Sequence, residues 1–495
     1  MVIVNFRGAA RQNYSIKIVS DYIKSQEDFG IIMELKGLVE SRIMHNGITN
    51  YSDIAKRLER LPVSWLHYKL LIIHGFGWLF DAMDVGIVTF VMAALAKDWK
   101  LPPGQLGLIG SASLAGMFLG AAVSGIVADY WGRKKVFQVT LLIFAVTSLL
   151  CAFAWNVTSL IIFRFLVGVG LGGELPVVSS LLSEFVPSKH RGRFIVLLES
   201  FWAYGWLIAA LIAFLIIPSH GWRIAFAIGA IPAFYIWIIR RKLPESPRWY
   251  ASKGRFVEAE ATMATLEKET ERLTRSSLPV VEKEPEKETN KSTRFTFVEL
   301  WTSEYRKRTI MLWILWFGLV FGYYGIFVWL PTLLIKAGYS MVNSFLYVVI
   351  ITLAQIPGYF SAAYLVERIG RKPVIVVYLL MSAMTAYLFG QASNTSSILL
   401  WASLMSFFNL GAWGAVYTYT PELYPTRARA TGAGSAAAFG RIGGILAPII
   451  VGFLLPSIGR GGVLAMNAAL LVVAAGAVGI LGLETKGRTL EEISA

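Results

Sequence analysis

The sequence predicts an all-α integral membrane protein with twelve transmembrane helices in two six-helix bundles. Of the 495 residues, 56% are hydrophobic and 16% are charged, and the mean hydropathy is +0.59. Ordinary soluble domains carry about 25% charged residues, so an ordinary soluble enzyme is excluded. The apolar, aromatic-rich composition excludes a disordered chain. The single cysteine, Cys151, excludes an intrachain disulfide scaffold.

A helix needs about 20 apolar residues to cross the hydrocarbon core of a bilayer, and twelve stretches of the chain meet this requirement. They cover residues 69–96, 105–127, 136–154, 159–182, 194–217, 222–240, 309–333, 342–365, 373–391, 396–419, 432–455 and 462–482.

The polar segments define the expected domains, which are a tail, a six-helix bundle, a linker, a second six-helix bundle and a second tail. These cover residues 1–68, 69–240, 241–305, 306–483 and 484–495. Within the first tail, Met33 begins a more ordinary-looking stretch, so residues 1–32 look like an upstream extension. Within the linker, the charged, proline-broken stretch at 282–293 is expected to be flexible.

Basic residues gather in alternate loops. The loop after the second span carries Arg133, Lys134 and Lys135, whereas the loop after the first carries only Lys97 and Lys100. The positive-inside rule places the basic loops and both termini in the cytoplasm. We therefore expect a multi-pass protein of the cell (inner) membrane. The same rule accounts for the net charge of +15 without a nucleic-acid partner.

The two halves repeat one another at an offset of 238 residues. Six positions of the first half agree in residue type, acid matched to acid, with six of the second half. The pairs are Asp129 and Glu367, Gly132 and Gly370, Arg133 and Arg371, Glu184 and Glu422, Pro187 and Pro425, and Arg191 and Arg429. A match without a gap at six positions indicates two parallel repeats of six helices.

Three further motifs carry a resemblance to a known family. The loop at 125–135 (GIVADYWGRKK) is similar to the signature G-x-x-x-D-R-x-G-R-R of the major facilitator superfamily, with Tyr130 in place of the usual basic residue. The second copy, 363–372 (AYLVERIGRK), has lost the first glycine, and 164–170 (RFLVGVG) resembles the superfamily's R-x-x-x-G-x-G. The resemblance covers about residues 65–493 and implies a secondary transporter that works by alternating access.

The short motifs that follow the sixth, tenth and twelfth spans resemble the sugar-porter and organic-ion-transporter branch of that superfamily. They are 244–248 (PESPR), 421–429 (PELYPTRAR) and 484–488 (ETKGR).

The repeated charged residues are expected to form a gating latch at the cytoplasmic ends of the helices. Acids and bases there can pair across the interface of the two halves in one state and separate when the halves rock. The alternative is that they serve only topology and helix capping. The gating residues of this hypothesis are Asp129, Arg133, Glu184, Arg191, Glu367, Arg371, Glu422 and Arg429.

Ionisable residues inside a membrane are costly and therefore suggest function. Asp81 and Asp84 lie three residues apart, on one face of the first span. A carboxylate pair can share a proton, so we expect this pair to take part in proton coupling, together with Glu174 and Arg164. The alternative is that these residues serve helix packing or a buried hydrogen-bond network.

Arg441 is the most informative of these residues. A guanidinium that faces a central cavity can bind a carboxylate with two hydrogen bonds. The alternative is a structural pairing with Asp84 or Glu174. The segment 440–448 (GRIGGILAP) resembles helix 11 of the organic anion/cation transporters, in which this position tends to be basic in anion carriers. That resemblance implies an organic anion.

The segment 80–84 (FDAMD) resembles the D-G-[FY]-D motif of aromatic-acid:proton symporters, with Ala82 in place of the glycine, and resembles still more the first helix of bacterial nicotinate transporters. A flat aromatic substrate could stack between aromatic rings; the alternative is that the rings fill helix packing or form interfacial belts. The expected substrate contacts besides Arg441 are Asn409, Trp413, Tyr417, Trp202, Tyr323 and Tyr324.

The sequence therefore predicts a monomeric transporter that imports a small aromatic or heteroaromatic monocarboxylate, such as nicotinate, together with protons. Sugar:proton symport is the alternative, although the seventh span lacks the paired glutamines typical of sugar porters. A non-transporting sensor on the same fold is a remote alternative. An enzyme is not expected, because the chain carries no phosphate-binding loop, metal cluster or nucleophile elbow. No cofactor other than the coupling proton is expected.

Overall fold

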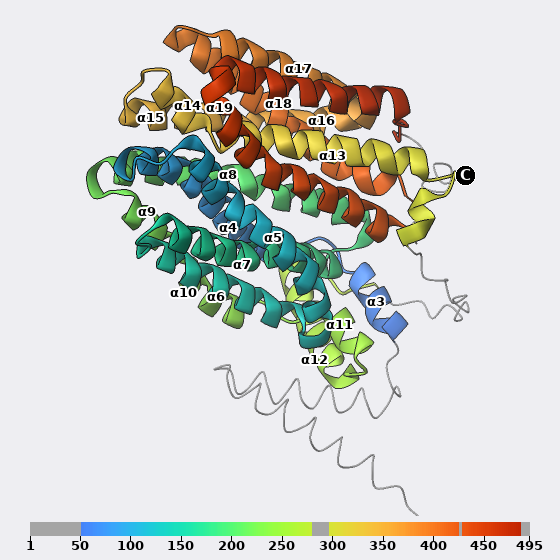
Figure 1. Ribbon diagram of the computed structural model, residues 1–495. Helices are drawn as coiled ribbons and strands as arrows, with labels where there is room; N and C mark the ends of the chain where they lie inside the picture. The colour runs from blue at the N-terminus through green and yellow to red at the C-terminus, as the bar shows by residue number, and fades with distance from the viewer. Residues whose placement is uncertain (1–50, 280–296, 425–427, 487–495) are drawn as a thin grey trace, which may run out of the picture.

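The computed structural model describes residues 51–279, 297–424 and 428–486, and this part of the chain is helical throughout, without a β-strand. The proposed extension at residues 1–32 and the charged stretch at 282–293 lie outside the described residues. Figure 1 shows the helices packed as two neighbouring groups, the first half of the chain in blue to green and the second in yellow to red.

The first bundle contains the six spans that precede the linker. Its helices are α4 (Trp65–Asp98), α5 (Pro103–Trp131), α6 (Arg133–Ala152), α7 (Val157–Phe185), α8 (Ser188–His220), and the pair α9 (Trp222–Ile228) and α10 (Pro232–Lys242), which together make one span.

The second bundle repeats this order. Its helices are α13 (Arg306–Phe327) with its short continuation α14 (Leu330–Lys336), the broken span α15 (Met341–Leu353) and α16 (Gln355–Ile369), α17 (Arg371–Gln391), α18 (Thr395–Glu422) and α19 (Arg429–Leu481).

Twelve spans are confirmed, although only eleven continuous candidates are found in the described chain. The difference arises in α19, where Gly459 has φ 64° and interrupts a helix of 53 residues. A residue at positive φ is not helical, and glycine adopts this conformation without steric cost. Two predicted spans, 432–455 and 462–482, therefore follow each other without a loop.

Most helices extend beyond the predicted spans at the end that carries the basic loops, which we call the basic end. There α3 (Tyr51–Glu59) packs on the linker helix α12 (Phe256–Thr274) through ion pairs. Arg57 binds Glu260 and, at 2.7 Å, Glu267. Burial raises the pKa of Glu267, but the hydrogen bonds and charges of Arg57 and Arg60 together outweigh this effect, and the pKa lies below its ordinary value. The remaining described elements are α11 (Pro247–Ser252) and a 3-10 helix at Phe297–Trp301.

The two bundles meet closely at the end opposite the basic end. The start of α5 lies against the middle of α19: Gly107 has no room for a side chain because the Pro448 carbonyl occupies that position. Ser111 Oγ donates a hydrogen bond of 2.7 Å to the Ile445 carbonyl. Small residues let helices approach to backbone contact in this way. Figure 1 shows α19 passing next to α5.

Candidate substrate and proton site

Arg441 lies between the two bundles, on the inner side of α19. The glycines that flank it, Gly440 and Gly444, pack against Trp316 and Tyr324 of α13. Its side chain is half-buried. It makes no hydrogen bond or ion pair with any other residue that the structure describes. Its charge acts electrostatically on Asp81 of the first bundle and on Tyr324 and Tyr417 of the second. An unpaired guanidinium in this place is available to a negatively charged ligand.

Asp84 does not pair with Asp81 in the manner that the sequence suggested. It forms a buried ion pair with Arg164 of α7, at 2.7 Å between Oδ2 and Nη1, and both side chains are 0% exposed. Ser148 donates to the other oxygen of Asp84 at 3.2 Å, and Arg164 also donates to Ser113 at 3.1 Å. Asp84 and Arg164 thus belong to a buried hydrogen-bond network, which the sequence offered as the alternative to proton coupling, and their part in proton coupling stays a prediction.

Asp81 instead faces Glu174 of α7. Both residues are fully buried, and each of the two carboxyl groups influences the titration of the other. Their four carboxyl oxygens have no hydrogen-bond donor among the other described residues. Two carboxyl groups can form a hydrogen bond only when one of them holds a proton. Asp81 and Glu174 are therefore neighbouring buried acids of α4 and α7, and their part in proton coupling stays a prediction.

Arg441 consequently serves neither Asp84 nor Glu174 as a structural counter-ion. Asp84 has Arg164 as its partner, and no ion pair between Arg441 and Glu174 is present among the described residues. The structural alternative considered for Arg441 lacks a partner in the described part of the chain.

Aromatic rings from both bundles surround this region. Trp202 of α8 donates a hydrogen bond of 3.1 Å to the Tyr323 hydroxyl of α13, which connects the two bundles. Trp413 and Tyr417 of α18 lie 5.7 Å apart between ring centroids, and Trp413 lies 5.8 Å from Tyr323. Four of the aromatic residues that the sequence singled out are thus in mutual contact.

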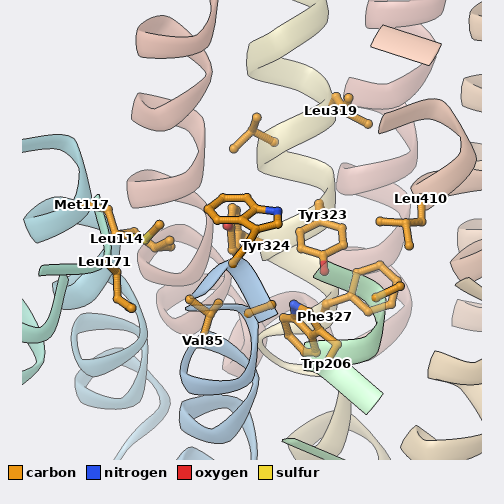
Figure 2. Close-up of a cluster of buried hydrophobic side chains, with 14 of the residues drawn as sticks. Val85, Leu114, Met117, Leu171, Trp206, Leu319, Tyr323, Tyr324, Phe327 and Leu410 are labelled. Atoms are coloured by element: carbon orange, nitrogen blue, oxygen red, sulfur yellow. The ribbon is translucent and has the colours of Figure 1, made fainter. Parts of the chain in front are cut away.

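Figure 2 shows how the neighbouring rings of this cluster lie. Trp206 of α8 lies beside Tyr323 and Phe327 of α13, with Tyr324 on the adjacent face of the same helix. The rings of Tyr323 and Tyr324 are 5.2 Å apart and nearly perpendicular, at 87°. Such edge-to-face packing gives rigid aromatic walls.

Asn409 is turned away from these rings toward α17. It is 0% exposed and donates to Ser382 Oγ at 3.2 Å, while its own Oδ1 has no partner among the described residues. The side chain of Asn409 is thus held within the second bundle, and its carbonyl oxygen Oδ1 lacks a hydrogen-bond donor among the described residues. Its expected contact with substrate stays a prediction.

The gating residues pair within each bundle, not across the interface. Arg133 binds Glu184 at 3.3 Å and Asp129 at 2.8 Å. Arg371 repeats the first contact, binding Glu422 at 3.0 Å. These contacts lie within one repeat, and pairing across the interface in the other state of the transporter stays a prediction.

The other gating residues differ between the halves. Arg191 binds Glu59 of α3 at 3.3 Å, and Glu59 also receives Arg248 at 2.8 Å. Glu367 is exposed and makes no ion pair among the residues described. The side chain of Arg429 lies outside the described residues.

Two glutamates that the sequence did not identify as functional complete these clusters. Glu245 accepts hydrogen bonds from the backbone N–H groups of Arg133 and Lys134, and Glu484 does the same for Arg371 and Lys372, at 3.0 to 3.3 Å. Burial raises the pKa of Glu245, and these backbone donors oppose the rise.

Each glutamate fits beneath a glycine at positive φ, Gly132 at 99° or Gly370 at 109°. The signal that could have found Glu245 and Glu484 is their spacing of 239 residues, one more than the offset of the repeat.

This arrangement is a buried acid pair, a cation without an ion-pair partner among the described residues, and a group of aromatic rings at the junction of two repeated bundles. The sequence profile described as "Sugar (and other) transporter" matches residues 82–495. The chain belongs to the sugar (and other) transporter family. It is accordingly a multi-pass membrane transporter with a small-molecule substrate.

Relatives in this family cover almost the whole chain. The niacin transporter NiaP of Acinetobacter baylyi is 50% identical over 442 residues, which are 89% of this chain and 99% of that protein. The putative niacin/nicotinamide transporter NiaP of Bacillus subtilis is 46% identical over 424 residues, 86% of this chain and 98% of that protein.

The solved structures agree on the fold. The xylose transporter XylE of E. coli, a major facilitator superfamily protein, matches in its inward-open conformation with a TM-score of 0.68 and 19% identity. The match covers 86% of this chain and 99% of XylE. The major facilitator fold that the motifs predicted is confirmed.

Proposed function

We propose that this family member imports a small aromatic or heteroaromatic monocarboxylate, with nicotinate as the leading substrate, by proton-coupled alternating access. The observation that carries the proposal is Arg441, a half-buried cation between the bundles without an ion-pair partner among the described residues. Two relatives of 50% and 46% identity that bear the name of niacin transporters support the choice of substrate.

Substrate and proton are coupled through the electrostatic contact between Arg441 and Asp81. In the empty transporter, the guanidinium stabilises the charged form of Asp81. A bound carboxylate neutralises Arg441, so that the Asp81–Glu174 pair then holds a proton more readily. By linkage, a proton on the pair strengthens binding of the anion to the same degree. An anion that crosses with one proton moves without net charge, and additional protons would make transport electrogenic.

The aromatic residues provide flat surfaces for the ring of the substrate. Trp202, Trp413 and Tyr417 are half-buried, so each has ring surface to offer a ligand. Stacking on aromatic rings adds affinity beyond the buried area. The basic end faces the cytoplasm under the positive-inside rule. The contacts of α5 with α19 then close the outer side of the path.

Sugar:proton symport is the second candidate, because the family includes sugar carriers and the fold matches that of a xylose transporter. A neutral sugar would leave the charge of Arg441 without a counter-ion. The carboxylate therefore fits the site better.

The test is uptake of radiolabelled nicotinate into proteoliposomes with an imposed pH gradient, alkaline inside. We expect accumulation that collapses with a protonophore, strong competition by unlabelled nicotinate and none by glucose or xylose. Nicotinamide, which lacks the carboxylate, is expected to compete weakly. Uptake of a sugar without uptake of nicotinate would refute the proposal.

Arg441→Gln tests the residue that carries the proposal. Charged hydrogen bonds contribute about 1.5 to 3 kcal/mol, so the apparent affinity should fall by about 10- to 150-fold. Arg441→Lys should recover only part of the loss, since an ammonium cannot form the two-pronged contact. Arg460→Lys, next to the break of α19 at Gly459, is the matched control and should leave the affinity unchanged. An unchanged affinity in Arg441→Gln would show that Arg441 does not bind the carboxylate.

A further inference from the structure

Three of the five histidines of the chain lie between the acid pair and the basic end. His67, His74 and Asp81 follow one another on α4 at steps of seven residues. Seven residues make almost two full helical turns, so the three side chains share one face and are spaced by about 10 Å along the axis. His67 and His74 are 1% and 0% exposed. No role in substrate binding or gating accounts for them.

His74 has a free acceptor nitrogen. Its Nδ1 lies 2.6 Å from the carbonyl oxygen of Leu70. A carbonyl only accepts, so Nδ1 of the neutral ring carries the hydrogen and Nε2 carries the lone pair. Nε2 is buried and has no hydrogen-bond partner within the described chain. An unpaired buried acceptor costs stability. A role of His74 Nε2 as a proton acceptor explains why the protein keeps this group in spite of the cost.

Gly77 lies on α4 between His74 and Asp81, and its missing side chain lets the ring of Phe137 and the carboxyl group of Glu174 come close to the helix backbone. A side chain at Gly77 would begin 3.4 Å from Glu174 Oε2 and 2.7 Å from the ring of Phe137. Phe137 in turn stacks on His74, with ring centroids 6.2 Å apart and planes within 8°. Glu174 and His74 thus adjoin the same position of α4, and Phe137 covers both from α6.

Between His74 and the basic end, the row of histidines continues with His67 of α4 and His190 of α8. The Nδ1 of His67 accepts the backbone N–H of Ser64 at 3.2 Å, so its Nε2 carries the hydrogen of the neutral ring. His190 of α8 is the titratable group that acts electrostatically on His67, and it is partly exposed at the basic end.

Other titratable groups around this row of histidines come from three helices. Glu174 faces it from α7, and Tyr235 of α10 donates its hydroxyl to the Ile73 carbonyl at 2.8 Å. From α12, Glu269 pairs with Lys69 at 3.2 Å near the basic end. At the level of His74, α8 presents the apolar Phe201.

We propose that His74 and His67 form the route by which the proton leaves the Asp81–Glu174 pair toward the basic end. This inference rests on the proposed proton-coupled transport. The carboxyl O–H bond breaks and an N–H bond forms at Nε2 of His74. The imidazolium then releases that proton toward His67 and regains its starting tautomer. Because the steps of about 10 Å exceed a hydrogen bond, water carries the proton between the side chains.

The transport test separates proton release from substrate binding. In proteoliposomes with an internal pH dye, we expect His74→Gln to slow nicotinate-driven proton delivery by about tenfold or more, the usual scale of a positioned acid–base group. Exchange of labelled for unlabelled nicotinate at equal pH should persist, since exchange needs no proton release. His220→Gln, an exposed histidine at the opposite end of α8, is the matched control and should behave as wild type. Normal proton delivery in His74→Gln would overturn the inference.

A second measurement does not depend on the substrate. Infrared spectroscopy follows the C=O band of the protonated acid pair, assigned by its loss in Asp81→Asn, as purified protein is moved into heavy water. We expect the band to exchange more slowly in His74→Gln than in wild type or His220→Gln, and equal rates would overturn the inference. Absence of nicotinate uptake by wild type, with this difference in exchange intact, would refute the proposed substrate and leave the proton route standing.

Discussion

The buried contact between Asp84 and Arg164 predicts that two aspartates only three residues apart have different roles. Replacing Asp84 by Asn leaves the Arg164 guanidinium at 0% exposure without its counter-ion. Removing one partner of a buried ion pair typically costs about 3 to 5 kcal/mol. Arg164 keeps its bond to Ser113 and its position 5.5 Å from the ring of Phe226. We therefore expect the lower part of that range, about 3 kcal/mol.

Asp81→Asn is the comparison. Asp81 belongs to a pair that can hold a proton, so its replacement by a neutral amide strands no charge and should cost much less. A difference of about 3 kcal/mol corresponds to roughly a hundredfold change in an equilibrium constant. Apparent melting temperatures of both variants, measured in the same detergent at one heating rate because such unfolding is often irreversible, should differ by several degrees, with Asp84→Asn lower.

The double variant Asp84→Asn with Arg164→Gln completes the cycle. Removing both charges should restore part of the stability, because the interaction energy of contacting residues is not additive. Equal stability of the two single aspartate variants, or a double variant that loses the sum of both single losses, would refute the assignment of Asp84 as the structural partner.

Three further predictions concern coupling, the backbone and pH. Asp81→Asn should abolish accumulation against a gradient but preserve exchange of labelled substrate; pH-gradient-driven accumulation in this variant would contradict its role. Gly370→Ala should destabilise the protein by about 1 to 3 kcal/mol, since φ is 109° there. Gly434 has open space around it, so Gly434→Ala should be neutral or stabilising. Melting curves of the two variants test this difference, and equal melting temperatures would contradict it. The pKa of Glu267 is lowered by its contacts with Arg57 and Arg60. The stabilisation of α3 by the contact between Arg57 and Glu267 should therefore be complete above about pH 5 and should disappear as the pH falls through the lowered pKa. Hydrogen exchange in α3 should therefore be faster in acid, and equal protection at neutral and acidic pH would contradict this.

The fold was predictable because its signals are local and repeated. Apolar length identified the spans, and charged residues at an offset of 238 identified the two repeats. The sequence predicted an interruption between residues 455 and 462, but not that a single residue, Gly459, makes it without a loop, since several other glycines stand in the same stretch. Only the geometry distinguishes the glycine that needs positive φ from those that allow close packing.

The partners of the charged residues were less predictable than the residues themselves. Asp81 and Asp84 share a face of α4, which suggested that they pair with each other. Helices α4 and α7 run in opposite directions, so Arg164 near the start of α7 meets Asp84, and Glu174, ten residues later, meets Asp81. The same limit applies to Arg133 and Arg371, because pairing within a repeat and pairing between repeats are equally compatible with the sequence.

The hydrogen bonds that Glu245 and Glu484 accept next to Gly132 and Gly370 have a consequence for how motion in this transporter can be observed. Glu245 and Glu484 each tie the segment after the last helix of a bundle to the start of its third helix, so these two parts of each half should move together at the basic end. A pair of spin labels on two parts tied within one bundle should report a constant separation through the whole cycle. A pair with one label on each bundle should report two distances, whose proportions shift when substrate is added.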